Sequence, residues 1–167
     1  MKNLNKIIFI IIFICALLIK FNIYAQKLIS DPIEYNDFIV KQQQDIGAQI
    51  GVLNTIITNP QSTEKLALEQ VNIILDITLK SIENTNNLVP LEPDFDFKMN
   101  AINLFNLYKK ILETSYVTMV KELYSANKDD NKLKKIYDEM ILEEKKYDEA
   151  YLASQEEFAT HYNFKLE

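Results

Sequence analysis

The sequence contains no arginine and no tryptophan, one cysteine, one histidine and two glycines among its 167 residues. Arginine is the side chain best suited to hold phosphate groups, because its guanidinium binds two oxygens at once. Acidic residues outnumber lysines, and the formal net charge is -6. Nucleic acid and anionic membrane surfaces are therefore poor partners for this chain.

The scarcity of cysteine and histidine limits the metal chemistry and the crosslinking that the chain can support. Structural zinc sites use Cys and His ligands, usually four of them, and ferritin-like di-iron sites need two Glu-x-x-His pairs. A single histidine and a single cysteine, Cys15, supply neither set. A disulfide within the chain is excluded for the same reason. The domain must therefore be held together by its hydrophobic core.

A long hydrophobic run does occur, but only near residue 1. Lys2 and Lys6 precede thirteen consecutive apolar residues, and a short tail then leads to Ala25. This order of a positive segment, an apolar core and a small residue is typical of a secretory signal peptide. The run is too short for a transmembrane helix, which needs about 20 apolar residues. The sequence predicts a signal peptide at residues 1–25 that is cleaved between Ala25 and Gln26.

Cleavage would place the mature chain outside the cytoplasm, in the periplasm, on the outer surface or in the medium, with no membrane span. It would also remove Cys15 and three of the 18 lysines but no acid, so the net charge would change from -6 to -9. Two alternatives remain open from the sequence. Acylation of Cys15 would tether the domain through a lipid, and a longer apolar anchor that tolerates Lys20 would tether it through the uncleaved segment.

Proline and glycine are confined to a few places, so long stretches contain nothing that would end a helix. The first predicted helix opens with a capping residue followed by Pro32 at the first helical position. No alternating pattern predicts a strand. The sequence predicts one domain, residues 26–167, with helices at about 32–58, 62–86, 95–126 and 131–162.

Apolar residues recur every three or four positions in each predicted helix, which is the spacing of helices that pack nearly parallel. Short connections before the second and fourth helices favour antiparallel neighbours. The predicted fold class is all-α, an antiparallel up-down-up-down four-helix bundle preceded by a cleaved signal peptide. The predicted stripes are Tyr35, Ile39, Gln42, Ile46, Gln49 and Leu53; Leu68, Val71, Leu75, Thr78 and Ile82; Ile102, Phe105, Tyr108, Ile111, Met119 and Leu123; and Leu133, Tyr137, Met140, Glu144, Tyr147, Tyr151, Ser154, Phe158 and His161.

Polar residues on these apolar stripes mark a candidate interior site. Alignment of the helices through their turns places Gln49 and Glu144 at one level, with the hydroxyl of Tyr108 or Tyr147 nearby. In one interpretation this polar layer of Gln49, Glu144 and Tyr147 binds a ligand or a cation. In the other, Glu144 lies at the edge of the bundle and the glutamines fix the register of the helices, as polar core residues can.

The single histidine suggests one specific cofactor to test. In an up-down bundle the start of the third helix and the end of the fourth lie together, so Met99 and His161 could approach one another. Met and His together are known axial ligands of haem, and four-helix bundles can hold it. The alternative is that His161 is a partly exposed residue at the end of a helix. No cofactor is otherwise predicted.

The chain is rich in aromatic residues, with nine tyrosines and nine phenylalanines. Several tyrosines fall where the third and fourth helices meet. They can pack in the core with their hydroxyls at its rim. The other interpretation is an exposed aromatic strip that recognises a protein or glycan partner.

Three short patterns resemble the LIC-type family of small exported bacterial surface proteins. They are Tyr35-Asn36-Asp37 at the start of the first helix, Tyr116 in the third, and Gln155-x-x-Phe158-Ala159-x-x-Tyr162 at the end of the fourth. The resemblance covers most of the mature chain. It implies an exported helical protein with no established activity, and it implies no catalytic residues.

The function predicted from the sequence is that of a non-enzymatic envelope or surface protein, a binding or interaction module for a protein or glycan partner. The export signal and the continuous apolar stripes support this prediction. A bundle that binds a small ligand or haem is the alternative. An enzyme is a third possibility, for which the sequence offers no convergent set of catalytic side chains.

Overall fold

The computed structural model describes residues 26–166, which are all-helical and contain four helices and no strand. The first two helices are α2 (Pro32–Thr58) and α3 (Glu64–Asn86). The third has three parts: α4 (Phe97–Ile111), a π-helical turn η1 (Leu112–Tyr116) and α5 (Val117–Leu123). The fourth is α6 (Asp130–His161). The all-α prediction is confirmed, whereas the predicted signal peptide and Ala25 lie outside the described residues.

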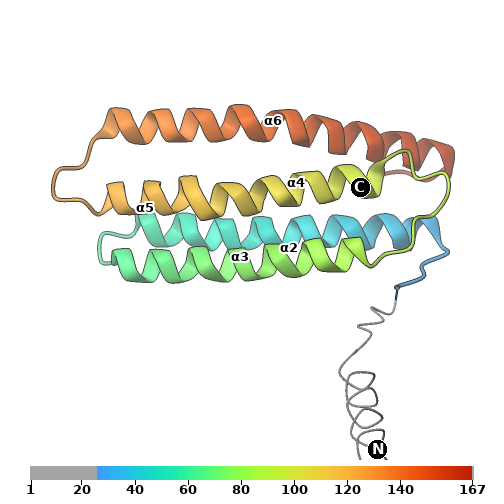
Figure 1. Ribbon diagram of the computed structural model, residues 1–167, viewed down its shortest axis with the longest axis horizontal. Coiled ribbons are helices and arrows are strands. Elements are labelled where there is room, and N and C mark those ends of the chain that lie inside the picture. Colours follow the sequence, from blue (N-terminus) through green and yellow to red (C-terminus); the bar gives the residue numbers. More distant parts are fainter. Residues whose placement is uncertain (1–25, 167) are drawn as a thin grey trace, which may run out of the picture.

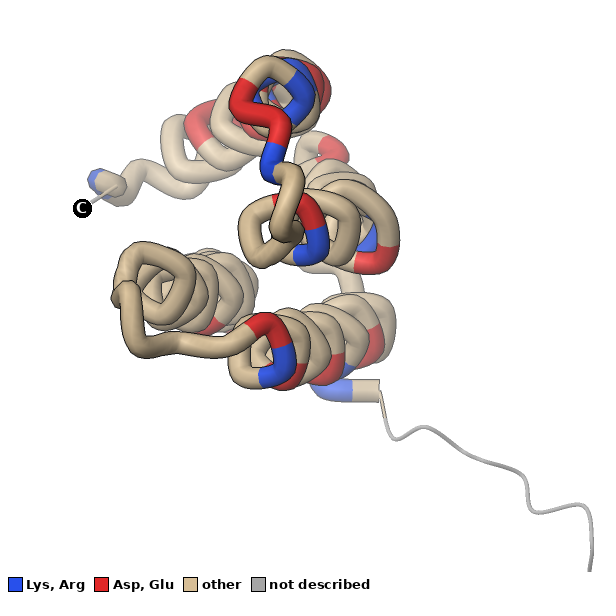
Figure 2. The backbone as a smooth tube through the Cα atoms, turned by 90° about the vertical axis from the view of Figure 1, so that its left-hand side faces the viewer, with Lys and Arg blue, Asp and Glu red and all other residues tan. Residues whose placement is uncertain are grey.

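The four helices run alternately in opposite directions along one long axis (Figure 1). Viewed along that axis, α6 lies at the top and α2 and α3 at the bottom (Figure 2), and the main hydrophobic cluster contains residues from all four helices. Helices that follow each other in the sequence pack closely, whereas α2 and α6 touch only sparsely. None of the helices within residues 26–166 is long and apolar enough to cross a membrane.

Side chains at the helix ends explain where the helices start. Asp31 accepts a hydrogen bond from the backbone N–H of Glu34 at 2.8 Å, and Thr63 caps α3 in the same way. Asp129 caps α6 by accepting from two backbone N–H groups. Such caps satisfy N–H groups that have no partner within the helix. The bounds of α2 coincide with the predicted range of 32–58, and those of α3 and α6 lie within two residues of the predicted ones.

The end of α6 is turned sharply by Asn163. This residue has a φ of 57°, and the N–H groups of Asn163 and Phe164 donate to the carbonyls of Thr160 and Ala159. These two bonds form a Schellman motif, in which asparagine tolerates the left-handed conformation. The following residues, Phe164 to Leu166, are thereby directed to the rim of the space between α6 and α2.

The π-helical turn in the third helix was not predicted and changes which residues face the core. The hydroxyl of Thr114 donates to the carbonyl of Lys110 at 2.7 Å, a side-chain bond that competes with the regular helical pattern. A π turn adds one residue to the helical repeat. The prediction placed Met119 on the core stripe. Because of the extra residue, the core-facing position moves by one, and Val120 is the fully buried residue there.

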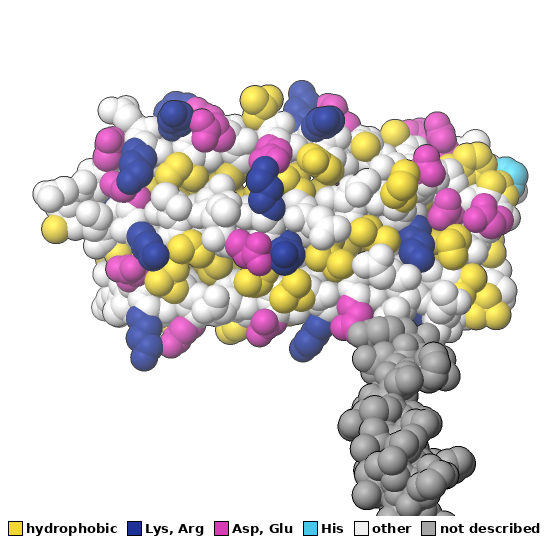
Figure 3. Space-filling model, viewed as in Figure 1, with side chains coloured by type: hydrophobic (Ala, Val, Ile, Leu, Met, Phe, Trp, Pro, Cys, Tyr) yellow, Lys and Arg dark blue, Asp and Glu magenta, His cyan; other side chains and the backbone are white. Residues whose placement is uncertain are grey.

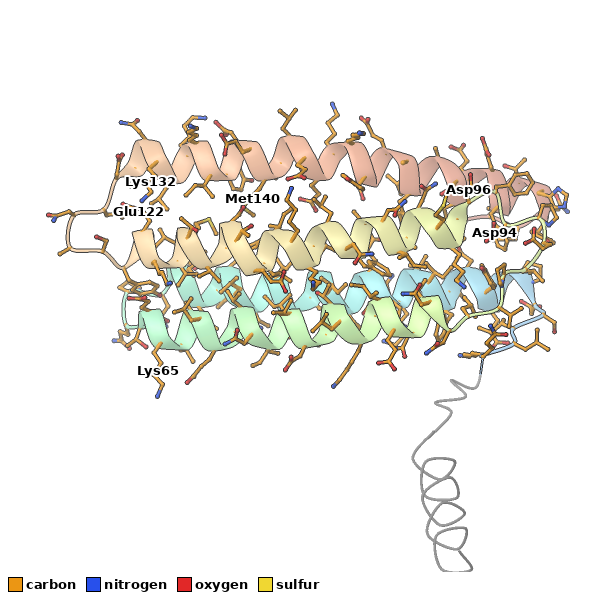
Figure 4. All side chains as sticks on the ribbon, in the orientation of Figure 1. Lys65, Asp94, Asp96, Glu122, Lys132 and Met140 are labelled. Carbon is orange, nitrogen blue, oxygen red and sulfur yellow. The ribbon has the colours of Figure 1, made fainter. Side chains whose placement is uncertain are left out.

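The surface carries charges of both signs, spread along the helices between hydrophobic side chains (Figure 3). An ion pair between Glu122 and Lys132 links the two ends of the turn between the third and fourth helices. The carboxylate of Glu122 accepts from Lys132 and from the backbone N–H of Asp129, and these two bonds lower the pKa of Glu122 (Figure 4). Further along α6, Met140 is buried against Leu107 and Ile111 of α4.

Candidate functional site

An open groove runs between α2 and α6 and is the candidate functional site. It consists of three adjoining cavities, of which the central one has a volume of about 380 Å³. This cavity shares Gln43 and Gln44 with a wider cleft near the C-terminal residues, and it shares Ile50, Tyr108 and Glu144 with a small inner cavity. We call these three cavities together the α2–α6 groove. Ligand cavities in proteins commonly measure about 300–1,000 Å³.

Glu144 of α6 provides the carboxylate at the centre of the groove. Its side chain is partly buried, and this burial raises the pKa of the carboxyl, as does the charge of Asp148 one turn further along α6. Tyr108 acts in the opposite direction. The ion pairs found within residues 26–166 involve neighbouring acids, such as Glu143 with Lys110, but neither Glu144 nor Asp148. Glu144 thus lines the groove without a lysine partner from the described chain.

Two phenols from the third helix flank this carboxylate. The hydroxyl of Tyr108 in α4 lies beside the side chains of Glu144 and Gln43. Burial raises the pKa of Tyr108 far above the usual phenol value, and the charge of Glu144 adds to that effect. Burial, and next the charge of Glu144, also raise the pKa of Tyr116 in the π-helical turn. Both phenols therefore stay protonated at physiological pH and can donate hydrogen bonds.

On the α2 side, one residue that lines the groove is a glycine, which has no side chain. Gly47 lines the central cavity, and a Cβ atom built on it would meet no heavy atom within 4 Å. A Cβ atom built on Gly51, one turn further on, would also meet no heavy atom within 4 Å, but Gly51 does not line the cavity. A glycine inside a helix costs about 0.5–1 kcal/mol relative to alanine, and at Gly47 it leaves space beside Glu144.

Removal of the charge of Glu144 is expected to stabilise the fold at neutral pH. Because the folded-state pKa is raised, the charged carboxylate costs the folded state stability above that pKa, and protonation at lower pH removes the cost. Glu144→Gln should therefore raise the Tm at pH 7, and the difference from the wild type should shrink as the pH falls toward about 4.3, the usual glutamate value. Thermal unfolding followed by circular dichroism at both pH values measures this.

Glu143→Gln is the matched control, since it removes a neighbouring carboxylate that forms an exposed pair with Lys110. Exposed pairs contribute about 0–1 kcal/mol, so this variant should not gain stability. An unchanged or lower Tm for Glu144→Gln at pH 7 would contradict a desolvated carboxylate at this position.

The predicted polar layer is only partly brought together. Glu144 and Tyr108 lie side by side, as one interpretation required. Gln49, in contrast, faces α3, where its side-chain oxygen accepts a hydrogen bond from Gln70 at 3.0 Å. Tyr147 packs against the hydrophobic core and is not part of the groove lining.

Gln43 is the glutamine that lies beside Glu144, and the sequence prediction missed it. It occupies a position next to the apolar stripe of α2, whereas the prediction considered only polar residues on the stripe itself. The run Gln42-Gln43-Gln44 was the available signal, because three consecutive amides interrupt the apolar pattern of a long helix. Two of these three residues, Gln43 and Gln44, line the groove.

The structure does not bring Met99 and His161 into a shared cavity. Met99 is 52% exposed at the start of α4. The ring of His161 packs on Phe95 and Tyr162, with ring centroids 5.2 and 4.8 Å apart, and the hollow beside it is not lined by Met99. Phe95, and not Met99, packs against the imidazole.

A cluster of metal-ligating side chains is not found at the groove or elsewhere within residues 26–166, where no group of three or more His, Cys, Asp or Glu residues could hold an ion. What the groove does contain is a half-buried carboxylate, phenol and amide groups, and apolar side chains from α2. This combination suits recognition of a small polar group attached to an apolar body. No family model, curated protein or solved structure matches the chain.

Proposed function

We propose that this chain is a non-enzymatic binding module of the cell envelope or exterior, and that it takes its ligand in the α2–α6 groove. One observation carries the proposal. The seam between the first and last helices stays open around a half-buried carboxylate, and its contacts are far sparser than those between consecutive long helices. A bundle built for stability alone would gain by closing this seam with apolar side chains.

The two phenols of the groove are suited to binding rather than to proton transfer. General acid and base catalysis works best when the pKa of the catalytic group lies near the working pH. The pKa values of Tyr108 and Tyr116 are moved away from neutrality by burial and by Glu144. These phenols are suited to orient a ligand through hydrogen bonds, with Gln43 as a further polar contact.

Export rests on the first 25 residues and on the resemblance to the LIC-type family. The positive residues, apolar core and small residue at position 25 match a cleaved signal peptide. A mature chain with a net charge of -9 and no cysteine is compatible with an oxidising compartment. We therefore propose that the bundle acts in the periplasm, on the outer surface or after release.

Native mass spectrometry of the protein purified from its own organism tests this function. Two variants in α2 make the test specific to the groove. Gly47→Phe fills the central cavity from a position with free space around its Cβ, and Gly51→Phe places the same ring one turn away, outside the lining. Neither change should cost helix stability, because phenylalanine has a higher helix propensity than glycine.

We expect the wild type and Gly51→Phe to carry a bound mass that Gly47→Phe lacks. Bare polypeptide in all three preparations, or equal retention by Gly47→Phe, would overturn the proposed binding site. The polypeptide mass in the same spectra reports the cleavage position, and retention of residues 1–25 would overturn the proposed release from the membrane.

A further inference from the structure

We infer that the central cavity of the α2–α6 groove selects a primary ammonium group on a short apolar stem, with Glu144 as its counter-ion. This inference rests on the proposed function of the groove and specifies the chemical class of its ligand. It is carried by the geometry of the cavity, in which one carboxylate lies among phenol and amide oxygens and apolar side chains.

The charges that face the cavity are negative or absent. Among the residues that line it, Glu144 of α6 is the charged group, Tyr108 of α4 is a neutral phenol, and Gln43 and Gln44 of α2 are uncharged. The nearby charge of Asp148, one turn further along α6, is negative too. No lysine of the described chain lines the cavity. An anionic ligand would be repelled, and a neutral ligand would leave a partly buried carboxylate without a counter charge, which is costly.

The acceptors in the cavity match the donors of an ammonium group. A primary ammonium has three N–H donors. The carboxylate of Glu144, the hydroxyl oxygen of Tyr108 and the amide oxygen of Gln43 can each accept one. The aromatic ring of Tyr116 borders the adjoining inner cavity, and aromatic rings attract cations through their faces.

The hydroxyl of Tyr151, a neighbour of Tyr108, adds a further oxygen atom near this cavity. Tyr151 is fully buried, and its hydroxyl finds no hydrogen-bond partner among the described residues. Burial raises the pKa of Tyr151, and Tyr108 and Asp148 raise it further, which shows that the hydroxyl lies near this polar group. A cation bound at Glu144 would offset the negative potential that these oxygens share.

The other residues that line the cavity determine which part of a ligand can be joined to the ammonium group. Ile46 and Ile50 border the cavity from α2, and Gly47 leaves room between them. An alkyl chain can therefore lie along α2 while its charged end reaches Glu144. A divalent metal ion fits less well, because Ca²⁺ takes about 6–8 oxygen ligands and several are usually carboxylate oxygens.

Three six-carbon probes of different charge test this specificity: hexylammonium, hexan-1-ol and hexanoate. Binding can be followed in an amide correlation spectrum of isotope-labelled full-length protein. The chain has two glycines, which give a built-in reporter and control, since Gly47 lines the cavity and Gly51 does not. We expect hexylammonium to shift the Gly47 resonance more than that of Gly51. Its affinity should exceed that of hexan-1-ol by about tenfold, the ratio that corresponds to 1.4 kcal/mol, and hexanoate should not bind.

Charge-neutral variants separate the role of Glu144 from that of the groove. Glu144→Gln should reduce hexylammonium binding to the level of hexan-1-ol, and Glu143→Gln, a change outside the cavity, should leave it unaltered. Equal binding of hexylammonium and hexan-1-ol that Gly47→Phe abolishes would overturn the ammonium inference while the groove keeps its proposed function. Absence of binding by hexylammonium would overturn the inference too, and native mass spectrometry decides the proposed function separately.

Discussion

Phe158→Ala is expected to lower the free energy of unfolding by about 3–5 kcal/mol, the usual cost of removing a buried phenylalanine ring. Phe158 is fully buried in the last turn of α6, which ends at His161. Its ring centroid lies 5.3 Å from that of Tyr35 in α2 and 5.5 Å from that of Phe97 in α4. It also contacts Tyr162 and Phe164, so one side chain joins three helices and the C-terminal turn.

Denaturant unfolding followed by circular dichroism measures the loss. Leu142→Ala serves as the control, because this leucine on the same helix is 74% exposed and its truncation should cost no more than about 0.5 kcal/mol. Equal stabilities of the two variants would show that the aromatic cluster does not hold the end of the bundle together. A changed dependence on denaturant would instead indicate a less compact denatured or native state.

Loss of one partner of the Asn36–Gln155 hydrogen bond is expected to cost about 1–3 kcal/mol, because the polar atom that formed the bond on the other amide stays buried without it. The amide nitrogen of Gln155 in α6 donates to the side-chain oxygen of Asn36 in α2 at 2.8 Å. Both residues are less than a tenth exposed. This bond is a direct polar link across the sparse seam between the first and last helices.

A double-mutant cycle isolates the contribution of the bond. Asn36→Leu and Gln155→Met keep the side-chain volumes, and the double variant should be less destabilised than the sum of the single ones by about 0.5–3 kcal/mol. The pair Gln42 and Asn84 is the control, since it has the same amide chemistry at 3.1 Å but lies at the exposed edge of α2 and α3. Its coupling should be near zero, and additive losses at Asn36 and Gln155 would contradict a buried link.

The starts of α2, α3 and α6 could be predicted to within two residues because their signals are local, whereas the third helix, predicted at 95–126, begins at Phe97 and ends at Leu123. Asp31 before Pro32, Thr63 and Asp129 all act within one turn of their own position, and the structure uses each as a cap. The all-helical fold followed from the repeated apolar spacing in the same way. The π-helical turn Leu112–Tyr116 has no comparable sequence signal, because one extra residue in the repeat hardly disturbs an apolar pattern.

The sequence predicted how far along the bundle axis the candidate site lies, but it did not predict which neighbouring helix each polar residue faces. Glu144 and Tyr108 could be matched because the chain turns fix how far along the axis each residue lies. Which neighbour a residue faces depends on a rotation of about 100° per residue. Gln49 therefore faces α3, where it meets Gln70, whereas Gln43 faces the groove. An apolar stripe shows which side of a helix faces the core. It does not show which of the two neighbouring helices is contacted by a residue beside the stripe.

The open seam between α2 and α6 also bears on the order in which the fold assembles. Asn36 and Gln155 are 119 positions apart, whereas consecutive helices are joined by short turns or a single loop. Contacts between distant parts of a chain form late, because the entropy of closing a long loop must be overcome first. The groove is thus bordered by sparse contacts between distant parts of the chain, which form late in folding. A ligand can reach Glu144 from the open side of this groove without unfolding of the bundle.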